Sequence, residues 1–516
     1  MSSELQLLVF LPALAALVVA LVPKSARANV VYPLTLTVSI IEAIIAIALA
    51  LQFKAGVAGY QGVSSYNWIP TFGISWRLGV DGISIFLVLL TAIIFPIAFF
   101  GAKEKSNTQS FAGWMLLLEA ACMGSFMSLD LFAFFVTFEL TLIPTYFLIG
   151  SWGYERGGAA AIKFFIYTFL GSALLLVGML ALVFIHDSQT GVLTFDISAL
   201  AKTSLSSGTE KWLFLAFTAA FAVKAPLFPF HTWSPDAYRQ APTAGVMVLA
   251  AVMAKLGTYG ILRFDFTLFP RAVESFGPLV LTLAVIGIIY GGIVAAAESD
   301  IKKMLAYSSL SHMGFIILGI FGLSREGVAG GVLQMINHGI YTAALFLIIG
   351  YLFAATDVFN MNRLGGLQSR APIMAGIFTL FVMSSIGLPG LSGFVGEFLI
   401  LVGGFSTHRW WAVVGTFGVV LSAVYMLWAY QRVFHGKATE PALVPEERSI
   451  DLKRNQILVL VPLIVIVVAL GVYPRPILDL GKIARPGGSI GERYPIEKDC
   501  RGEATEEKVL QACLAR

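Results

Sequence analysis

Long apolar runs separated by short polar segments make up most of this chain. A membrane-spanning helix needs roughly 20 consecutive apolar residues, and by that criterion the runs predict about fourteen transmembrane helices. Their approximate ranges are 5–22, 30–51, 82–101, 112–128, 131–150, 161–185, 212–230, 241–262, 276–296, 303–321, 329–354, 373–403, 411–434 and 456–473. We therefore predict an all-α polytopic membrane protein.

Composition agrees with this pattern. The 516 residues are 58% hydrophobic and 12% charged, whereas a soluble domain has roughly 25% charged residues. If the N-terminus lies outside, the inside loops contain more Lys and Arg than the outside loops, and the positive-inside rule favours this orientation. The first run resembles a signal peptide, but it starts with Glu4 and carries no positive charge, so we expect it to remain a helix.

Two loops and the C-terminal tail are long enough to form structure outside the membrane. Residues 52–81 predict a small β-hairpin, and residues 186–211 a short surface helix. Cys500 and Cys513 lie in the tail, where the sequence allows either a disulfide or two free thiols.

Two of the predicted spans are interrupted by proline and glycine. Pro226 and Pro229 follow Lys224 in the first, and Pro389 and Gly390 precede Glu397 in the second. These residues remove helical hydrogen bonds and free backbone groups at membrane depth. Comparable breaks in two halves are typical of transporters built from inverted repeats. Two unrelated proline kinks are the alternative.

The breaks fall at matching places in two successive blocks of five spans, and an odd number of spans inverts the second block relative to the first. The expected divisions are an N-terminal three-helix region (1–111), a first repeat (112–263), a second repeat (276–435), a connecting segment with the last helix (436–473), and an extramembrane tail (474–516).

Four charged residues lie inside predicted spans: Glu139, Lys224, Lys255 and Glu397. A charge at mid-membrane costs about 2.5–3.5 kcal/mol on insertion scales, so it persists only if it is paired, hydrated or functional. We interpret the four as proton-translocating groups, with Glu139 able to approach and pair with Lys224. The alternatives are permanently protonated acids, static ion pairs and, for Glu397, a charge at the membrane interface.

Three histidines, His231, His312 and His338, can relay protons because imidazole gives and accepts a proton near neutral pH. A packing role is the alternative for each. Lys302, in the short loop before the tenth span, is expected to be solvated. The sequence has no Gly-rich nucleotide loop, cysteine cluster or haem ligand pair, so we expect no cofactor or metal in this chain.

Several longer motifs carry a family resemblance. They are Phe138-Glu139-Leu140 with Pro144-Thr-Tyr-Phe-Leu-Ile, Lys163-Phe-Phe-Ile-Tyr-Thr168, Phe221-Ala-Val-Lys224-Ala-Pro226, His231-Thr-Trp-Ser-Pro-Asp236, Gln240-Ala-Pro-Thr-Ala-Gly245, Asp300-Ile-Lys-Lys, Tyr307-Ser-Ser-Leu-Ser-His312-Met-Gly-Phe and Phe394-Val-Gly-Glu397-Phe. Over about residues 75–435 the chain resembles the antiporter-like subunits of respiratory complex I, the proton-pumping NADH:quinone oxidoreductase.

The resemblance implies fourteen helices in two inverted five-helix repeats, each with a broken helix. It implies that Glu139 and Lys224 form a coupling pair, that Lys255 is a central relay, and that Glu397 is the exit group. A glutamate at that last position resembles the M-type chains, where L-type and N-type chains usually have lysine.

The resemblance also implies a setting for the chain. Expected partners are the lipid bilayer and L-type and N-type neighbours in a bacterial cytoplasmic (plasma) membrane, with no nucleic acid. NADH, flavin, iron-sulfur clusters and quinone are expected on partner subunits, so this chain would contribute to a translocase without a redox centre of its own. The alternatives are a subunit of a multisubunit sodium/proton antiporter and a non-conducting membrane scaffold.

Overall fold

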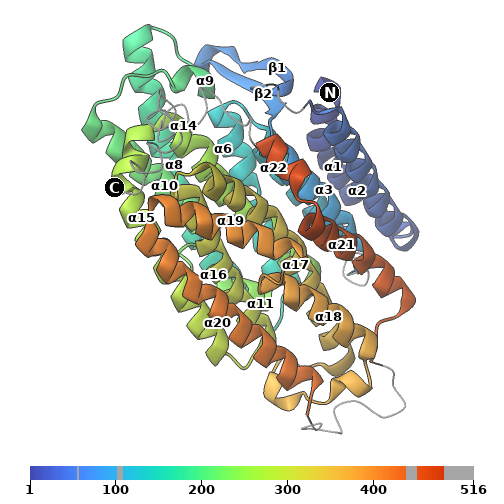
Figure 1. The fold of residues 1–516 in the computed structure, drawn as a ribbon. Coiled ribbons are helices and arrows are strands. Elements are labelled where there is room, and N and C mark those ends of the chain that lie inside the picture. The colour runs from blue at the N-terminus through green and yellow to red at the C-terminus, as the bar shows by residue number, and fades with distance from the viewer. Residues whose placement is uncertain (55–56, 58, 102–108, 437–449, 482–516) are drawn as a thin grey trace.

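The computed structural model describes residues 1–54, 57, 59–101, 109–436 and 450–481. Within these ranges the chain is a bundle of long helices with a small hairpin at one end (Figure 1). Cys500 and Cys513, for which either a disulfide or free thiols was expected, lie outside the described residues.

In the described residues, the first part of the chain contains the hairpin and ten α-helices, the last of which follows the first break. They are α1 (Ser2–Leu21), α2 (Arg27–Gln52), β1 (Gln61–Ile69), β2 (Ile74–Val80), α3 (Ser84–Gly101), α5 (Gln109–Met127), α6 (Leu131–Leu140), α7 (Leu142–Trp152), α8 (Gly157–Thr190), α9 (Ile197–Leu200), α10 (Ser207–Lys224) and α11 (Ser234–Gln240). The hairpin and the short helix α9 confirm the structures predicted for the two long loops.

The second part begins with a span that has two π-helical segments, Leu249–Met253 and Ile261–Asp265. Its α-helices are α12 (Thr243–Val248), α13 (Ala254–Gly260), α14 (Phe266–Leu268), α15 (Pro270–Ala297), α16 (Ile301–Phe321), α17 (Arg325–Thr356), α18 (Pro372–Ser385), α19 (Ser392–Thr407), α20 (Arg409–Phe434), α21 (Arg454–Val472) and α22 (Arg475–Gly481).

Twelve helices or runs of helices in the described part are long and apolar enough to cross a membrane. The predicted spans at α10–α11 and α18–α19 are not among the twelve, and these are the two that contain Pro226 and Pro389. The count of fourteen, the two inverted repeats and the predicted division of the chain remain predictions.

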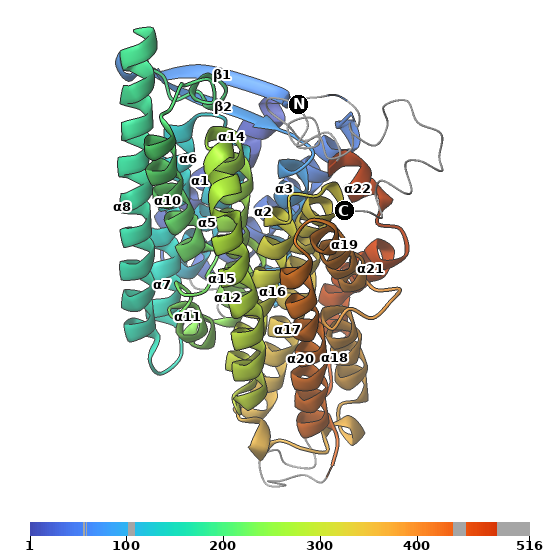
Figure 2. The same cartoon turned by 60° about the vertical axis from the view of Figure 1, so that its left-hand side comes forward.

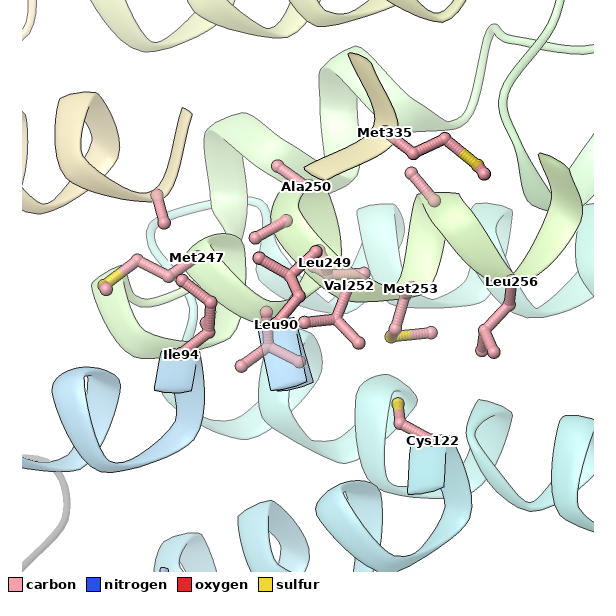
Figure 3. Packing of buried hydrophobic residues seen from close by; sticks show 14 of the residues in the cluster. Leu90, Ile94, Cys122, Met247, Leu249, Ala250, Val252, Met253, Leu256 and Met335 are labelled. Atoms are coloured by element: carbon pink, nitrogen blue, oxygen red, sulfur yellow. The ribbon is translucent and has the colours of Figure 1, made fainter. Parts of the chain in front are cut away.

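The span Thr243–Leu268 forms the centre of the bundle, and its most apolar stretch is wholly buried. Figure 3 shows its residues Met247, Leu249 and Val252 packed towards Leu90 and Ile94. Helices such as α8, α15 and α20 instead expose large apolar side chains, as expected of surfaces that face lipid or a partner subunit. Figure 2 shows α8 on one flank of the bundle and α18 and α20 on the other.

The hairpin is joined to the centre of the bundle by a buried ion pair. Asp81 follows β2, and its carboxylate accepts two hydrogen bonds of 2.8 Å from the guanidinium group of Arg263. Tyr60 and Tyr259 also bond to that guanidinium group. Burial favours a raised pKa for Asp81, but Arg263 and the backbone N–H groups of Ile83 and Ser84 hold the pKa below its ordinary value.

Replacing Asp81 with alanine tests how much this pair contributes. Among the described residues, Arg263 pairs with no other carboxylate, so Asp81→Ala leaves a buried charge and should lower the free energy of unfolding by about 3–5 kcal/mol. The measurement is the thermal loss of helical circular dichroism in detergent. Arg77→Ala removes the half-exposed Arg77–Asp196 pair and should cost about 1 kcal/mol or less. Equal small losses would contradict the prediction.

Candidate functional site

The first break places Lys224 at the end of a helix in the protein interior. Lys224 is the last residue of α10, and Pro226 and Pro229 lie in the irregular segment that follows. Because Pro226 has no N–H, the next N–H, that of Leu227, bonds to the carbonyl of Ala222 at 2.9 Å. The freed backbone is thus satisfied locally, and the break is an ordered feature.

The Lys224 ammonium group is held by the neighbouring helix pair. Its Nζ donates to Thr141 Oγ1 at 2.6 Å and to the Phe138 carbonyl at 3.4 Å, and it lies 4.5 Å from the centre of the Phe138 ring. Thr141 is the junction at which α6 ends and α7 begins. A discontinuity between helices therefore supplies the partners of this buried cation.

Glu139 lies two residues from that junction, yet in this structure it forms no ion pair with Lys224. The expected approach of the two groups is therefore not seen in this conformation, in which the ammonium group bonds to Thr141 and to the Phe138 carbonyl. Glu139 is half-buried, and its Oε1 has no hydrogen-bond partner among the described residues. The two groups are near enough to interact electrostatically.

Lys255 lies between the two π-helical segments of the central span. Its Nζ donates to the carbonyl of Ala250, five residues earlier, at 2.6 Å, and lies 2.5 Å from His338 Nδ1 on α17. A π-helical turn shifts backbone bonds to i→i+5 and is frequent at functional sites. Neither π segment was predicted, because no proline marks them in the sequence.

His338 belongs to a group of titratable side chains that lie close together on α16 and α17. The ring centroids of His312 and His338 are 5.6 Å apart, and Tyr341 lies 5.6 Å from the first and 5.5 Å from the second. His312 Nδ1 is 3.4 Å from Glu397 Oε1, and His312 Nε2 is 3.3 Å from Ser385 Oγ. All of these side chains are buried.

The second break borders the Glu397 carboxylate. The chain turns between α18 and α19 through Gly387 (φ +75°) and Gly390 (φ +93°), with Pro389 between them, and a left-handed φ favours glycine. A Cβ at Gly387 would lie 2.7 Å from Glu397 Oε2. The break therefore makes room for this carboxylate, which also accepts from Gln334 Nε2 at 3.3 Å.

Four of the predicted residues, Lys255, His338, His312 and Glu397, are thus brought together in one continuous cluster. Lys224 lies on the adjacent helix α10, where Gly257 of α13 packs against its last turn so closely that any Cβ would clash with the backbone of Phe221 and Ala225. His231 lies apart from the cluster, where it stacks on Phe228 at 5.6 Å and meets the Tyr290 ring edge-on at 5.1 Å. The predicted roles of these residues remain predictions.

Sequence reasoning missed several buried polar groups. Glu42 and Glu119 are fully buried in α2 and α5, and Asp265 is buried with Thr218 as its hydrogen-bond donor. The rule that identified Glu139, an acid inside an apolar run, applies equally to Glu42 and Glu119. The polar partners Thr141 and Gln334 carry no such signal, because hydroxyls and amides are common in helix packing.

Lys302 corrects another expectation. It was expected to be solvated, but its side chain is buried, donates to the Ala241 carbonyl at 2.5 Å and lies 4.5 Å above the Tyr154 ring. The reason is that Asp300 caps α16 and pairs with Arg239, which turns this loop inward. In the described ranges no group of three or more His, Cys, Asp or Glu side chains forms a metal site.

Comparison with known proteins agrees with this architecture. The family described as NADH:quinone oxidoreductase/Mrp antiporter, TM matches residues 128–422. NADH-quinone oxidoreductase subunit M of Rhodobacter capsulatus is 40% identical over 493 residues, covering 93% of this chain and 95% of that protein. The protein of the same name from Escherichia coli (strain K12) is 40% identical over 437 residues, covering 83% and 86%.

Two solved structures have the same fold. A chain of respiratory complex I from Thermus thermophilus with bound NADH matches with a TM-score of 0.82 and 31% identity, over 92% of this chain and 98% of that chain. A chain of the Mrp complex from Dietzia sp. DQ12-45-1b matches with a TM-score of 0.83 over 93% and 96% of the two chains, at 23% identity. The second match supports the fold alone. The predicted all-α membrane fold is confirmed.

Thr141→Val tests the partner of Lys224. Valine keeps the shape but removes the acceptor 2.6 Å from the buried ammonium group, so the variant should be destabilised by about 1.5–3 kcal/mol. Thr145→Val is the matched control: its single hydroxyl proton has the Thr141 carbonyl at 2.7 Å and the Met253 sulfur at 3.1 Å as acceptors, neither of which is charged, and the change should cost about 1 kcal/mol or less. Thermal unfolding measures both, and equal losses would contradict the assignment.

Proposed function

Because this chain belongs to the NADH:quinone oxidoreductase/Mrp antiporter transmembrane family, we propose that it is an M-type proton-translocating membrane subunit of an NADH:quinone oxidoreductase. The observation that carries the proposal is the buried run Lys255, His338, His312 and Glu397, which links the central span to the second helix break. Each member can hold or release a proton.

The spacing of these groups suits stepwise proton transfer. Lys255 Nζ and His338 Nδ1 are 2.5 Å apart, so one proton serves both nitrogens. His338 Nε2 has no hydrogen-bond partner among the described residues and is free to pass a proton towards His312, directly or through one water molecule. His312 then faces Glu397 at 3.4 Å, and Glu397 is the group from which the proton leaves.

Lys224 and Glu139 supply the control element of the proposal. Moving one charge across 100 mV costs about 2.3 kcal/mol, and two charges 4 Å apart interact by about 4 kcal/mol at an effective dielectric of 20. Exchanging Thr141 for Glu139 as the partner of Lys224 is therefore a change of the required size. In the conformation described here Lys224 is bound to Thr141, which corresponds to the separated state of the pair.

The chemistry that drives such movement belongs to partner subunits. We propose that NADH oxidation, flavin, iron-sulfur clusters and quinone reduction lie there, and that L-type and N-type chains are neighbours in the membrane. The outer apolar faces of α8, α15 and α20 provide surfaces for lipid or for such neighbours. His231 remains a candidate relay at the first break, with Pro226 and Pro229 beside it.

A sodium/proton antiporter subunit is the second candidate. Its fold is the same, since the Mrp chain superposes as well as the complex I chain does. Sequence favours the first candidate, because the relatives named subunit M are 38–40% identical whereas the Mrp chain is 23% identical.

Glu397→Gln tests the proton path. The amide keeps the shape but cannot take up a proton from His312, so NADH-driven proton uptake by inverted membrane vesicles should fall by about tenfold or more. Glu326→Gln, an exposed change in the first turn of α17, is the control and should pump normally. Normal pumping by Glu397→Gln in a fully assembled complex would contradict the mechanism.

Affinity purification of the tagged chain from its own membranes separates the two candidates. If it is an NADH:quinone oxidoreductase subunit, flavin and iron-sulfur absorption should co-purify with it in fixed ratio. An antiporter subunit would instead arrive without redox centres and support sodium-dependent proton exchange in liposomes. The second result would overturn the proposal.

A further inference from the structure

A pair of buried carboxyl groups on α2 and α5 lies outside the cluster described above. Glu42 of α2 and Glu119 of α5 are both fully buried, and Ser39, which lies one turn before Glu42 on α2, donates to Glu119, so the two carboxyl groups are neighbours. Thr35, Ser39 and Glu42 occupy one face of α2 at helical spacing, and all three are buried. The opposite face of α2 exposes Ile40 and Ile44.

The hydrogen bonds around this pair are incomplete without a proton. Ser39 Oγ donates to Glu119 Oε2 at 2.7 Å. Neither oxygen of Glu42, nor Oε1 of Glu119, receives a hydrogen bond from a donor elsewhere in the described structure. A carboxylate can only accept, so a bond between the two groups requires a proton on one of them.

The surrounding helices offer no cation that would let both acids ionise. α3 has no titratable residue, and Glu4, the one such residue of α1, pairs with the N-terminal amine. The other titratable or charged residues of α2 and of the elements packed against the pair are Arg27 and Tyr32 on α2, Cys122 on α5, Glu139 and Tyr146 on α6 and α7, Arg77 on β2, and Lys255 and Tyr259 on α13. Among the described residues none of the cations forms an ion pair with Glu42 or Glu119.

Cys122 connects the surroundings of the pair with those of Lys224. It follows Glu119 by one turn of α5 and lies near both Glu119 and Lys224. Figure 3 shows Cys122 pointing from α5 towards Met253 of the central span.

We propose that Glu42 and Glu119 form a second proton-binding site, which shares one proton between two carboxyl groups and responds to the charge on Lys224. Like charges in contact inside an apolar site cannot both ionise, which is the physical basis of the shared proton. A metal ion is not the proposed ligand, because two carboxyls and one hydroxyl are too few oxygens for Na⁺-like or Ca²⁺-like coordination. The response to Lys224 rests on the proposed function; the shared proton does not.

Infrared spectra of the purified, assembled complex test the shared proton. The spectrum of the wild type minus that of Glu42→Gln/Glu119→Gln should contain one band of a protonated carboxyl group and the bands of one carboxylate. Glu274→Gln removes an exposed carboxyl on α15 and should lose carboxylate bands alone. A wild-type-minus-double-variant spectrum with only carboxylate bands, or one that depends on added Na⁺, would overturn the proposal.

Lys224→Ala tests the response of the site to the lysine. Removing a neighbouring positive charge favours the protonated acids, so the carboxylate bands of the pair should titrate at a pH higher by roughly one unit. An unchanged titration would overturn the coupling. Proton pumping is measured in the same preparation: normal pumping by Lys224→Ala would contradict the proposed function while leaving the carboxyl bands in place, so the two failures are distinguishable.

Discussion

The constraint on which this structure depends is that an ionisable side chain inside the membrane must find a polar partner within the protein. Regular helices offer few, because their backbone groups bond to one another. Here the partners come from irregular backbone: the junction at Thr141 serves Lys224, and the π-helical segment containing Ala250 serves Lys255. Helix breaks that would weaken a simple bundle are therefore the features that make buried charges tolerable.

Small residues are the second requirement, because they let the irregular segments pack closely against neighbouring helices and charged side chains. Gly257 lets α13 touch the last turn of α10, and Gly387 leaves space for the Glu397 carboxylate. A methyl group at either position would have to displace backbone or a charged oxygen. The glycines thus help to set the distances between the titratable groups.

The sequence predicted the helical membrane fold, the hairpin and both helix breaks, because long apolar runs and prolines are strong local signals. It also identified Lys255, His312, His338 and Glu397, which the structure brings together. It could not provide the partners of Lys224, since Thr141 is an ordinary hydroxyl in sequence and becomes an acceptor only through packing. Lys302 was misjudged because its burial depends on how the Asp300 loop folds inward.

The two parts of the site differ in connectivity, and this difference bears on how they would work together. The part around Glu397 is a continuous series of close contacts from Lys255 onwards, whereas Lys224 is held by Thr141 apart from Glu139. A proton could then move in the second part without any change of partner at Lys224. Coupling between them must pass through the tight packing of α10 on α13, since that contact joins the two lysine-bearing elements. On the proposed function, a shift of Lys224 towards Glu139 would change the backbone position at Lys255 and the electrostatic potential around it.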